Sequence, residues 1–244
     1  MITTHAAPER YTPAEFEHSV LSHSPSVAVF DCDGTLWSGD AGYGFMVWSI
    51  DQGLVSRNAS DWIDAQYRLY LTGDVSEEQI CGEMVQIYAD LHEDEIRRAA
   101  ADYFRAHIEP HIFPELRSLV EKLQTIGSEI WAVSSTNNWV IEEGVSRFKI
   151  PASHVLAARV RIHDGRITGD LIDVPTGRGK VAALRRVGIT HPDAVFGNSI
   201  HDEAMLAIAK HAFPVNPSPA LLETAGRTGW TVFYPESILA DAKL

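Results

Sequence analysis

In the second half of this chain, short apolar runs alternate with helical segments. The runs EIWAV (129–133), AVF (194–196) and AFPV (212–215) are each followed by a polar or turn-forming stretch and are separated by helix-like segments. An earlier run, SVAVF (26–30), is apolar with almost no interruption, which indicates a strand buried on both faces. Strands that alternate with helices favour a doubly wound, Rossmann-like parallel sheet of the α/β class. We therefore expect one such sheet with helices on both faces.

The segment 41–110 shows helical periodicity only. One helix is predicted to begin after Ser60 and another after Ser76, which opens the capping sequence SEEQ. Several helices in succession without a strand are typical of a small bundle. We predict a Rossmann-like catalytic core of residues 1–40 and 111–244, with residues 41–110 forming a helical cap domain inserted into it.

Local signals define two further elements. Thr12 and Glu15 form a capping box around Pro13, which predicts the first helix. Farther along, VLAARVRIH (155–163) and RITGDLIDV (166–174) flank the dipeptide Asp-Gly, which is typical of a two-residue turn between antiparallel strands. We therefore expect a β-hairpin at residues 155–174.

Composition and charge narrow the classes of partner. The formal net charge is −13 at pH 7, whereas nucleic acids and anionic membranes need clustered Lys and Arg, so we expect neither as a partner. The first residues, MITTHAAPER, lack the regions of a secretion signal, and no apolar stretch is long enough to span a membrane. Two cysteines, Cys32 and Cys81, do not indicate a disulfide framework. We expect a cytoplasmic protein, and a homodimer stays open as its oligomeric state.

Polar segments follow three of the predicted strands at their carboxyl ends, where ligands bind in sheets of this kind. The first segment is DCDGT, in which we expect Asp31 and Asp33 to share a face while Cys32 points away. The second is SST, in which Ser134, with Ser135 beside it, is expected where the strand meets a helix start. A hydroxyl and backbone N–H groups at such a position can hold an anion.

The third polar segment, GNSIHD, carries Asn198 and Asp202, and Lys180 begins the preceding helix. Clustered carboxylates need a nearby cation, or one of them must stay protonated. The oxygen ligands available come from Asp31, Asp33, Asn198 and Asp202, and such a set suits Mg²⁺, a hard ion that bridges to phosphate. A carboxylate nucleophile, a metal, a hydroxyl and a lysine together make a phosphoryl-transfer site.

The motifs DCDGTL, WAVSS, GRGK and GNSIHD occur in this order and resemble the signature of the haloacid-dehalogenase superfamily. The helical segment 41–110, the Asp-Gly hairpin and PVNPSPALL resemble the phosphoserine-phosphatase-like branch of that superfamily. The resemblance implies a Mg²⁺-dependent phosphoric monoester hydrolase with a Rossmann-like core and a cap. Its partner would be a small-molecule phosphomonoester substrate.

The resemblance also implies roles for individual residues. Asp31 would be the nucleophile that forms an aspartyl-phosphate, and Asp33 would protonate the leaving alcohol and then activate water. Ser134 and Lys180 would hold the phosphoryl oxygens, with Ser135 adjoining. The implied metal ligands are Asp31, the backbone carbonyl of Asp33, Asn198 and Asp202, one of the last two directly and the other through water.

Two positions depart from the family pattern, and a third follows it. Asn198 stands where the fourth motif has Asp, and a neutral amide is a weaker Mg²⁺ ligand than a carboxylate. Met84 aligns, without gaps, with the arginine that binds the serine carboxylate in phosphoserine phosphatases, and Arg57 and Arg68 stay open as substitutes. Asp40 occupies the position of the acidic residue that binds the substrate amine in those enzymes.

These positions predict a substrate that carries an amine and lacks a carboxylate, with phosphoethanolamine and phosphocholine as examples. Trp37, Tyr43 and Trp48 lie near Asp40 in the sequence and offer cation–π contacts, although packing is the commoner role of such residues. Phosphoserine phosphatase, a phosphotransferase and a non-catalytic phospholigand-binding protein stay open as alternatives. The last of these is supported by Asn198 alone.

Overall fold

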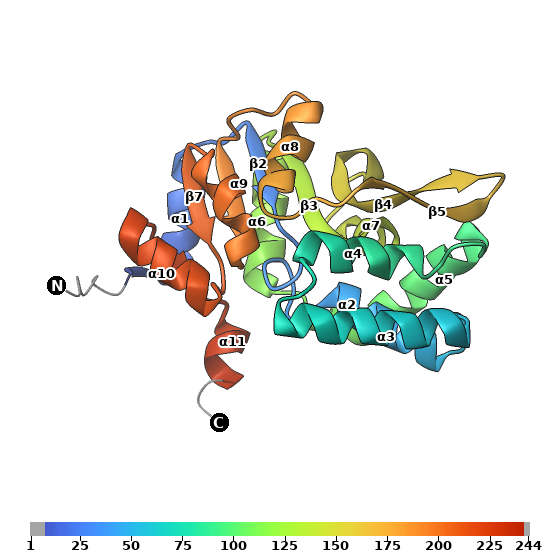
Figure 1. Cartoon of the computed structure of the whole chain (residues 1–244). Coiled ribbons are helices and arrows are strands. Elements are labelled where there is room, and N and C mark those ends of the chain that lie inside the picture. The colour runs from blue at the N-terminus through green and yellow to red at the C-terminus, as the bar shows by residue number, and fades with distance from the viewer. Residues whose placement is uncertain (1–7, 242–244) are drawn as a thin grey trace.

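The computed structural model describes residues 8–241, and a six-stranded sheet lies at its centre (Figure 1). The strands lie in the order β5-β4-β3-β2-β6-β7, and only the pair β4 and β5 is antiparallel. Their bounds are β2 Val27–Phe30, β3 Glu129–Asn137, β4 Val155–His163, β5 Arg166–Asp173, β6 Ala194–Gly197 and β7 His211–Pro214. This arrangement confirms the predicted Rossmann-like α/β class.

Helices pack against both faces of the sheet. They are α1 Pro13–Ser22, α6 Pro114–Thr125, α7 Asn138–Ser146, α8 Arg178–Arg186, α9 Glu203–Ala207 and α10 Pro219–Thr228, with α11 Glu236–Asp241 near the C-terminus. Ala28 and Phe30 belong to one buried apolar cluster and Val29 to a second, because successive side chains of a strand point to opposite faces. The near-continuous apolar run in β2 is therefore explained by burial on both sides.

Four helices between β2 and β3 form a group that we call the inserted helices, and Figure 1 shows them together on one side of the molecule. They are α2 Ala41–Asp51, α3 Arg57–Thr72, α4 Glu77–Gln86 and α5 Glu93–Tyr103, followed by a π-turn and a 3₁₀-turn up to His111. Ser76 caps α4 as predicted. The prediction that a helix begins after Ser60 is wrong, because Ser56 caps α3 by accepting the N–H of Ala59.

The hairpin of β4 and β5 turns at the predicted dipeptide. Asp164 and Gly165 have φ angles of 49° and 74°, as a type I′ turn requires at both of its central residues. The hairpin also supports the inserted helices, because Asp90 N donates to Ile167 O at 2.8 Å and Gln86 Nε2 donates to Gly169 O at 2.6 Å. It thereby ties the segment after α4 to the sheet.

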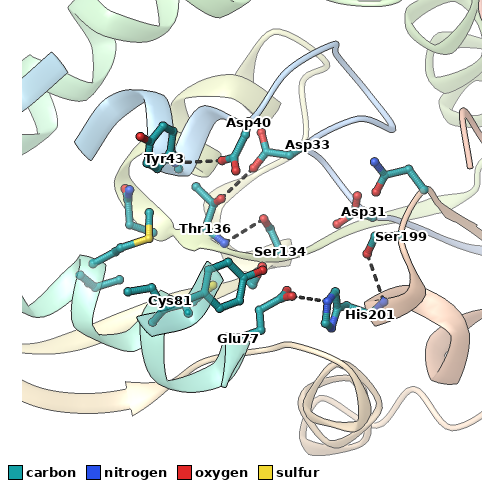
Figure 2. Close-up of a pocket in the computed structure, with 18 of the residues that line it drawn as sticks. Asp31, Asp33, Asp40, Tyr43, Glu77, Cys81, Ser134, Thr136, Ser199 and His201 are labelled. Carbon is teal, nitrogen blue, oxygen red and sulfur yellow. Dashed lines mark hydrogen bonds and ion pairs between the residues drawn. The ribbon is translucent and has the colours of Figure 1, made fainter. Parts of the chain in front are cut away.

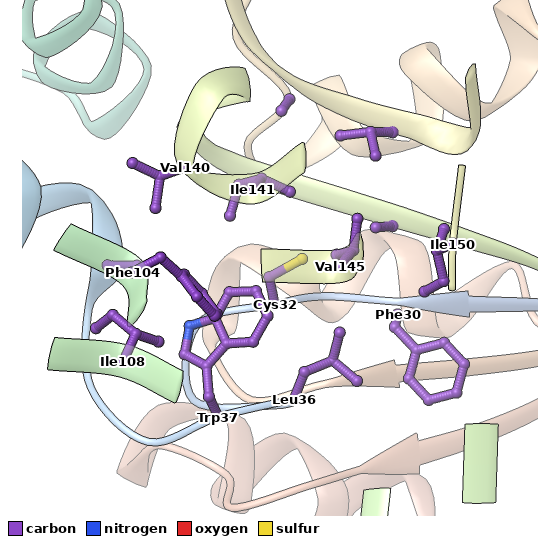
Figure 3. Packing of buried hydrophobic residues seen from close by; sticks show 14 of the residues in the cluster. Phe30, Cys32, Leu36, Trp37, Phe104, Ile108, Val140, Ile141, Val145 and Ile150 are labelled. Atoms are coloured by element: carbon purple, nitrogen blue, oxygen red, sulfur yellow. The ribbon is translucent and has the colours of Figure 1, made fainter. Parts of the chain in front are cut away.

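Apolar packing anchors the loop that follows β2, as Figure 3 shows. Cys32, Leu36 and Trp37 are fully buried and belong to the same cluster as Phe104 and Val140. Cys32 thus points away from its two aspartate neighbours, as predicted. Because these apolar side chains are held in the core, the polar side chains between them are fixed at the edge of the sheet.

The end of the chain differs from the expected continuous sheet. β8 Val232–Phe233 lies outside the six-stranded sheet and pairs with β1 Arg10–Tyr11 in a separate two-stranded sheet. β1 is too short to show an alternating pattern in the sequence. None of the described helices is long and apolar enough to cross a membrane.

Candidate active site

A cavity of about 310 Å³ lies where the polar ends of the strands meet the inserted helices (Figure 2). Loops after β2 and β6, the end of β3 and the start of α8 supply its inner wall, and α2, α3 and α4 supply the rest. Seven of the eight predicted site residues line it together, namely Asp31, Asp33, Asp40, Ser134, Ser135, Lys180 and Asn198. Asp202 lies just behind this wall and contacts Lys180.

Lys180 bridges two carboxylates that come from different strand ends. Its Nζ donates to Asp31 Oδ1 at 2.7 Å and to Asp202 Oδ1 at 2.6 Å, and it also reaches the carbonyl of Val133 at 3.3 Å. All three side chains are at least nine-tenths buried. Truncating one partner would leave a buried charge uncompensated, so this triad defines the electrostatics of the site.

Burial and neighbouring charges shift the pKa values of Asp31 and Lys180. Burial first, and then the charge of Asp202, raise the pKa of Asp31 to about 7, although Lys180 opposes this. Burial would lower the pKa of Lys180, but Asp202 and Asp31 hold it above its usual value. Lys180 is therefore a fixed positive charge beside the predicted nucleophile.

Asp33 is held by three donors on the other side of the cavity. Its Oδ1 accepts the Trp37 Nε1–H at 2.7 Å and the Ala41 N–H at 2.8 Å, and its Oδ2 accepts the Thr136 hydroxyl at 2.7 Å. Burial, followed by the charge of Asp40, raises the pKa of Asp33 to about 6 in spite of these donors. A carboxyl group with this pKa exchanges protons near neutral pH, as an acid–base catalyst must.

The segment after the apolar part of β3 differs from the prediction. Ser134 is not at a helix start, because β3 continues to Asn137 and the Asn137 side chain caps α7 by accepting the Val140 N–H. Ser134 Oγ instead accepts the Thr136 N–H at 3.1 Å. Its hydroxyl still borders the cavity, but the N-terminus of α7 lies at Asn137 and not at Ser134.

The loop after β6 folds closely over the first motif. A Cβ built on Gly34 would lie 1.9 Å from Asn198 Nδ2, so the Asn198 side chain packs directly on Gly34, whose φ is +77°. Asp202 Oδ2 accepts the N–H groups of Asn198 and Ser199, each at 2.9 Å. Because Asp202 is bound on both oxygens, it orders this loop and holds Lys180.

The donor set around Asp31 fits a hard divalent ion. The side chains of Asp31, Asp33 and Asn198 offer carboxylate and amide oxygens, and Gly34 permits the close approach of the amide. Within the described residues, no group of three or more His, Cys, Asp or Glu side chains forms a metal-binding cluster by itself. A metal here therefore depends on Asn198, backbone carbonyl groups and water as well as on carboxylates.

Asp40 lies at the start of α2 and caps this helix by accepting the Tyr43 N–H at 2.9 Å. Burial raises its pKa, and the charge of Glu77 adds to the increase. Asp40 faces the cavity from the side of Asp33 (Figure 2), and its second role as a helix cap was missed by the sequence reading.

The aromatic residues around Asp40 differ from the predicted set. Tyr43 lines the cavity, but Trp37 is fully buried in the core and Trp48 packs on Phe45 and Tyr103. Two further rings, Tyr67 and Tyr70 of α3, line the cavity instead. Their spacing on an amphipathic helix is the only sequence signal that could have pointed to them, and such spacing is more typical of packing.

The cavity wall formed by α4 Glu77–Gln86 carries a glutamate and no arginine. Met84 lines the cavity, whereas, among the described residues, no arginine does, so neither Arg57 nor Arg68 supplies a carboxylate clamp. Glu77 lines this wall and forms an ion pair with His201 of the loop after β6. The hydrogen bond that His201 donates to Glu77 raises the pKa of His201. Sequence reasoning did not find Glu77, because a Glu in the first turn of a helix is ordinary.

Comparison with known proteins agrees with this geometry. The model of the haloacid dehalogenase-like hydrolase family matches residues 28–207. A histidinol-phosphatase of Neisseria meningitidis serogroup C is 26% identical over 218 residues, which cover 85% of this chain and 97% of that protein.

Two solved structures share the fold. A protein of unknown function from Bordetella pertussis superposes with a TM-score of 0.75 and 24% identity, covering 85% of this chain and 97% of that one. A phosphoserine phosphatase with bound substrate superposes with a TM-score of 0.57 and 16% identity, covering 86% and 92%. These likenesses confirm the predicted resemblance in fold to the phosphoserine-phosphatase-like branch.

Proposed function

Because this chain belongs to the haloacid dehalogenase-like hydrolase family and acts as a phosphatase, we propose that it hydrolyses a small, amine-bearing phosphomonoester through an aspartyl-phosphate on Asp31. The observation that carries the proposal is the buried Lys180 bridge between Asp31 and Asp202, with Asp33 in the same cavity. We further propose that the inserted helices, within residues 41–110, act as a cap that excludes bulk water.

In this proposal the residues act in two steps. Asp31 attacks phosphorus while Asp33, in its protonated form, donates a proton to the leaving alcohol oxygen. Asp33, now ionised, then takes a proton from water, which attacks the aspartyl-phosphate and releases inorganic phosphate. Lys180 and the Ser134 hydroxyl, with Ser135 adjoining, bind the phosphoryl oxygens throughout.

We propose Mg²⁺ as the cofactor, held by Asp31, the Asp33 carbonyl and Asn198, with Asp202 reaching it through water. When bound, the ion supplies positive charge that stabilises the phosphoryl group during transfer. The commitment of both Asp202 oxygens to Lys180 and to loop amides supports the indirect role. Free thiols at Cys32 and Cys81 are consistent with the proposed cytoplasmic location.

The substrate amine is assigned to Asp40. A carboxylate that faces the cavity beside Tyr43 suits an ammonium group, which it neutralises. The absence of a cavity-lining arginine among the described residues disfavours a substrate carboxylate and therefore phosphoserine, the alternative substrate. An amino-alcohol phosphate such as histidinol phosphate has the amine and lacks the carboxylate, and a relative named histidinol-phosphatase supports it.

The test is phosphate release with Mg²⁺ from histidinol phosphate, phosphoethanolamine, phosphocholine, phosphoserine and an amine-free sugar phosphate. We expect release that vanishes with EDTA and in Asp31→Asn, and a loss of preference for amine-bearing esters in Asp40→Asn. Equal activity toward amine-bearing and amine-free esters, unchanged in Asp40→Asn, would refute the substrate class. Phosphate binding without any release would favour the alternative of a non-catalytic binding protein.

A further inference from the structure

Glu77 is a second carboxylate in the cavity, and the proposed chemistry does not use it. It is the first residue of α4, and its side chain is only 17% exposed. Its Oε1 accepts the Thr176 hydroxyl at 3.0 Å, and its Oε2 pairs with His201 Nε2. A half-buried carboxylate with two partners is held in one orientation, facing the cavity.

Glu77 and Asp40 lie on opposite sides of the cavity in Figure 2, yet they influence each other. Both carboxylates line the same cavity, and the charge of Glu77 adds to the increase that burial causes in the pKa of Asp40. Tyr67 and Tyr70 line the cavity with them. Burial, followed by the charge of Glu77, raises the pKa of Tyr70. This end of the cavity is thus acidic and aromatic.

The side chain that pairs with Glu77 indicates which chemical group of a substrate Glu77 can bind. The imidazole of His201 already meets this carboxylate through a ring nitrogen. The His201 side chain is 39% exposed, more than twice the exposure of Glu77, so it has room to move aside while Glu77 stays in place. A ring of the same kind on a substrate would meet the same oxygen and lie among tyrosine faces, which attract cationic rings.

We propose that Glu77 determines substrate specificity by accepting an N–H from an imidazole ring of the substrate, while Asp40 binds its ammonium group. This inference rests on the proposed function, which assigns the amine to Asp40. It narrows the substrate class to amino-alcohol phosphates that carry a second, ring nitrogen. An analogue whose ring displaces His201 but lacks this N–H leaves Glu77 without the hydrogen bond that His201 had supplied, so the site rejects it.

The experiment compares two substrates that share a backbone. Histidinol phosphate carries an imidazole, and phenylalaninol phosphate carries a phenyl ring at the same position. For Glu77→Gln we expect kcat/KM toward histidinol phosphate to fall ~10-fold, mainly through KM, since the hydrogen-bond acceptor loses its charge. Toward phenylalaninol phosphate we expect a change of less than about twofold.

Two control variants separate recognition from a structural role. Glu78→Gln alters the neighbouring exposed glutamate of α4 and should leave both substrates unaffected. His201→Ala removes the internal partner of Glu77, and we expect it to preserve the preference for histidinol phosphate. If His201→Ala reproduces the loss seen in Glu77→Gln, Glu77 only positions His201 and the inference is overturned.

The outcomes also distinguish this inference from the proposed function. Hydrolysis of both amine-bearing esters, reduced equally by Glu77→Gln, overturns the role of Glu77 and leaves the role of Asp40 intact. Failure of the unmodified protein to hydrolyse any amine-bearing ester, with hydrolysis of an amine-free one, overturns both. A preference for histidinol phosphate that disappears in Glu77→Gln alone supports the inference.

Discussion

The indole N–H of Trp37 donates a 2.7 Å hydrogen bond to Asp33 Oδ1, and the two residues lie four positions apart in the loop after β2. The Trp37 ring is fully buried and packs edge-on against Phe104 at 5.1 Å between ring centroids. The core therefore fixes the side chain that orients the proposed acid–base group. Thr136 completes this support from a separate strand, with its hydroxyl 2.7 Å from Asp33 Oδ2.

Thr136→Val should slow catalysis and shift its pH dependence. The variant keeps the shape of the side chain but loses one hydrogen bond to Asp33, so we expect kcat to fall roughly 10-fold. That hydrogen bond favours the ionised carboxylate, so its loss raises the pKa of Asp33 above about 6. Since the protonated form is the acid, the high-pH decline of kcat/KM should move to higher pH.

The matched control is Thr136→Ser, which keeps the hydroxyl. Steady-state rates from pH 5 to pH 9, with thermal unfolding of both variants, check the prediction. An equal loss in both variants, or a decline that moves to lower pH, would contradict it.

Mg²⁺ binding should release a proton from Asp31. Burial and the charge of Asp202 raise the pKa of this carboxyl to about 7. When no metal is bound, it is therefore largely protonated below neutral pH. An added cation favours the ionised form, so the apparent Mg²⁺ affinity should fall roughly tenfold per pH unit below 7. Calorimetric titration in buffers of different ionisation enthalpy measures the protons released. Asp31→Asn should release none, and an affinity independent of pH between 5.5 and 8 would disprove the coupling.

Gly34→Ala should displace Asn198 and weaken the proposed metal site. The added Cβ would lie 1.9 Å from Asn198 Nδ2, at a φ of +77° that side-chain-bearing residues rarely adopt. We expect Mg²⁺ affinity to fall ~10–100-fold, the range typical when the support of a ligand is lost. Gly188→Ala is the control, because Gly188 has a φ of +87° and nothing within 4 Å of an added Cβ. Retained affinity in Gly34→Ala would remove Asn198 from the site.

Asp193→Asn should destabilise the core in a pH-dependent way. Asp193 Oδ2 accepts the N–H groups of Ser26 and Val27 at 2.9 and 3.0 Å, and its Oδ1 contacts Lys210 Nζ at 2.5 Å. We expect a loss of about 1–2 kcal/mol in the free energy of unfolding at pH 7. The Lys210 ammonium is exposed, so most of this loss should come from the two backbone hydrogen bonds.

The pH dependence follows from the lowered pKa of Asp193, whose largest cause is the hydrogen bond from Lys210. A carboxyl with a lowered pKa in the folded state stabilises the protein above its unfolded pKa of about 4, and this contribution is lost as the pH falls from that value through the lowered pKa of the folded state. Urea unfolding at pH 7 and pH 3 should therefore show a larger difference between the variant and the unmodified protein at pH 7 than at pH 3. Asp64→Asn, which alters an exposed ion pair, should change stability by less than about 0.5 kcal/mol.

Local sequence features predicted much of the fold and of the inner wall of the site. The class of the sheet, the Asp-Gly hairpin and the caps at Thr12 and Ser76 depend on spacings of a few residues, and all were confirmed. The helix start after Ser60 and the helix-terminal position of Ser134 were wrong. In both cases a nearby polar residue, Ser56 or Asn137, was an equally good cap, and tertiary packing decided between them.

The sequence by itself determined which residues follow the strands, because periodicity and motif order are properties of neighbouring positions. Only the tertiary structure decided that Lys180 lies buried between Asp31 and Asp202, and that Trp37 supports Asp33 rather than facing a substrate. It also decided that Glu77 meets His201 across the cavity. Such contacts join residues far apart along the chain, and they form only when apolar burial brings the inserted helices and the sheet together.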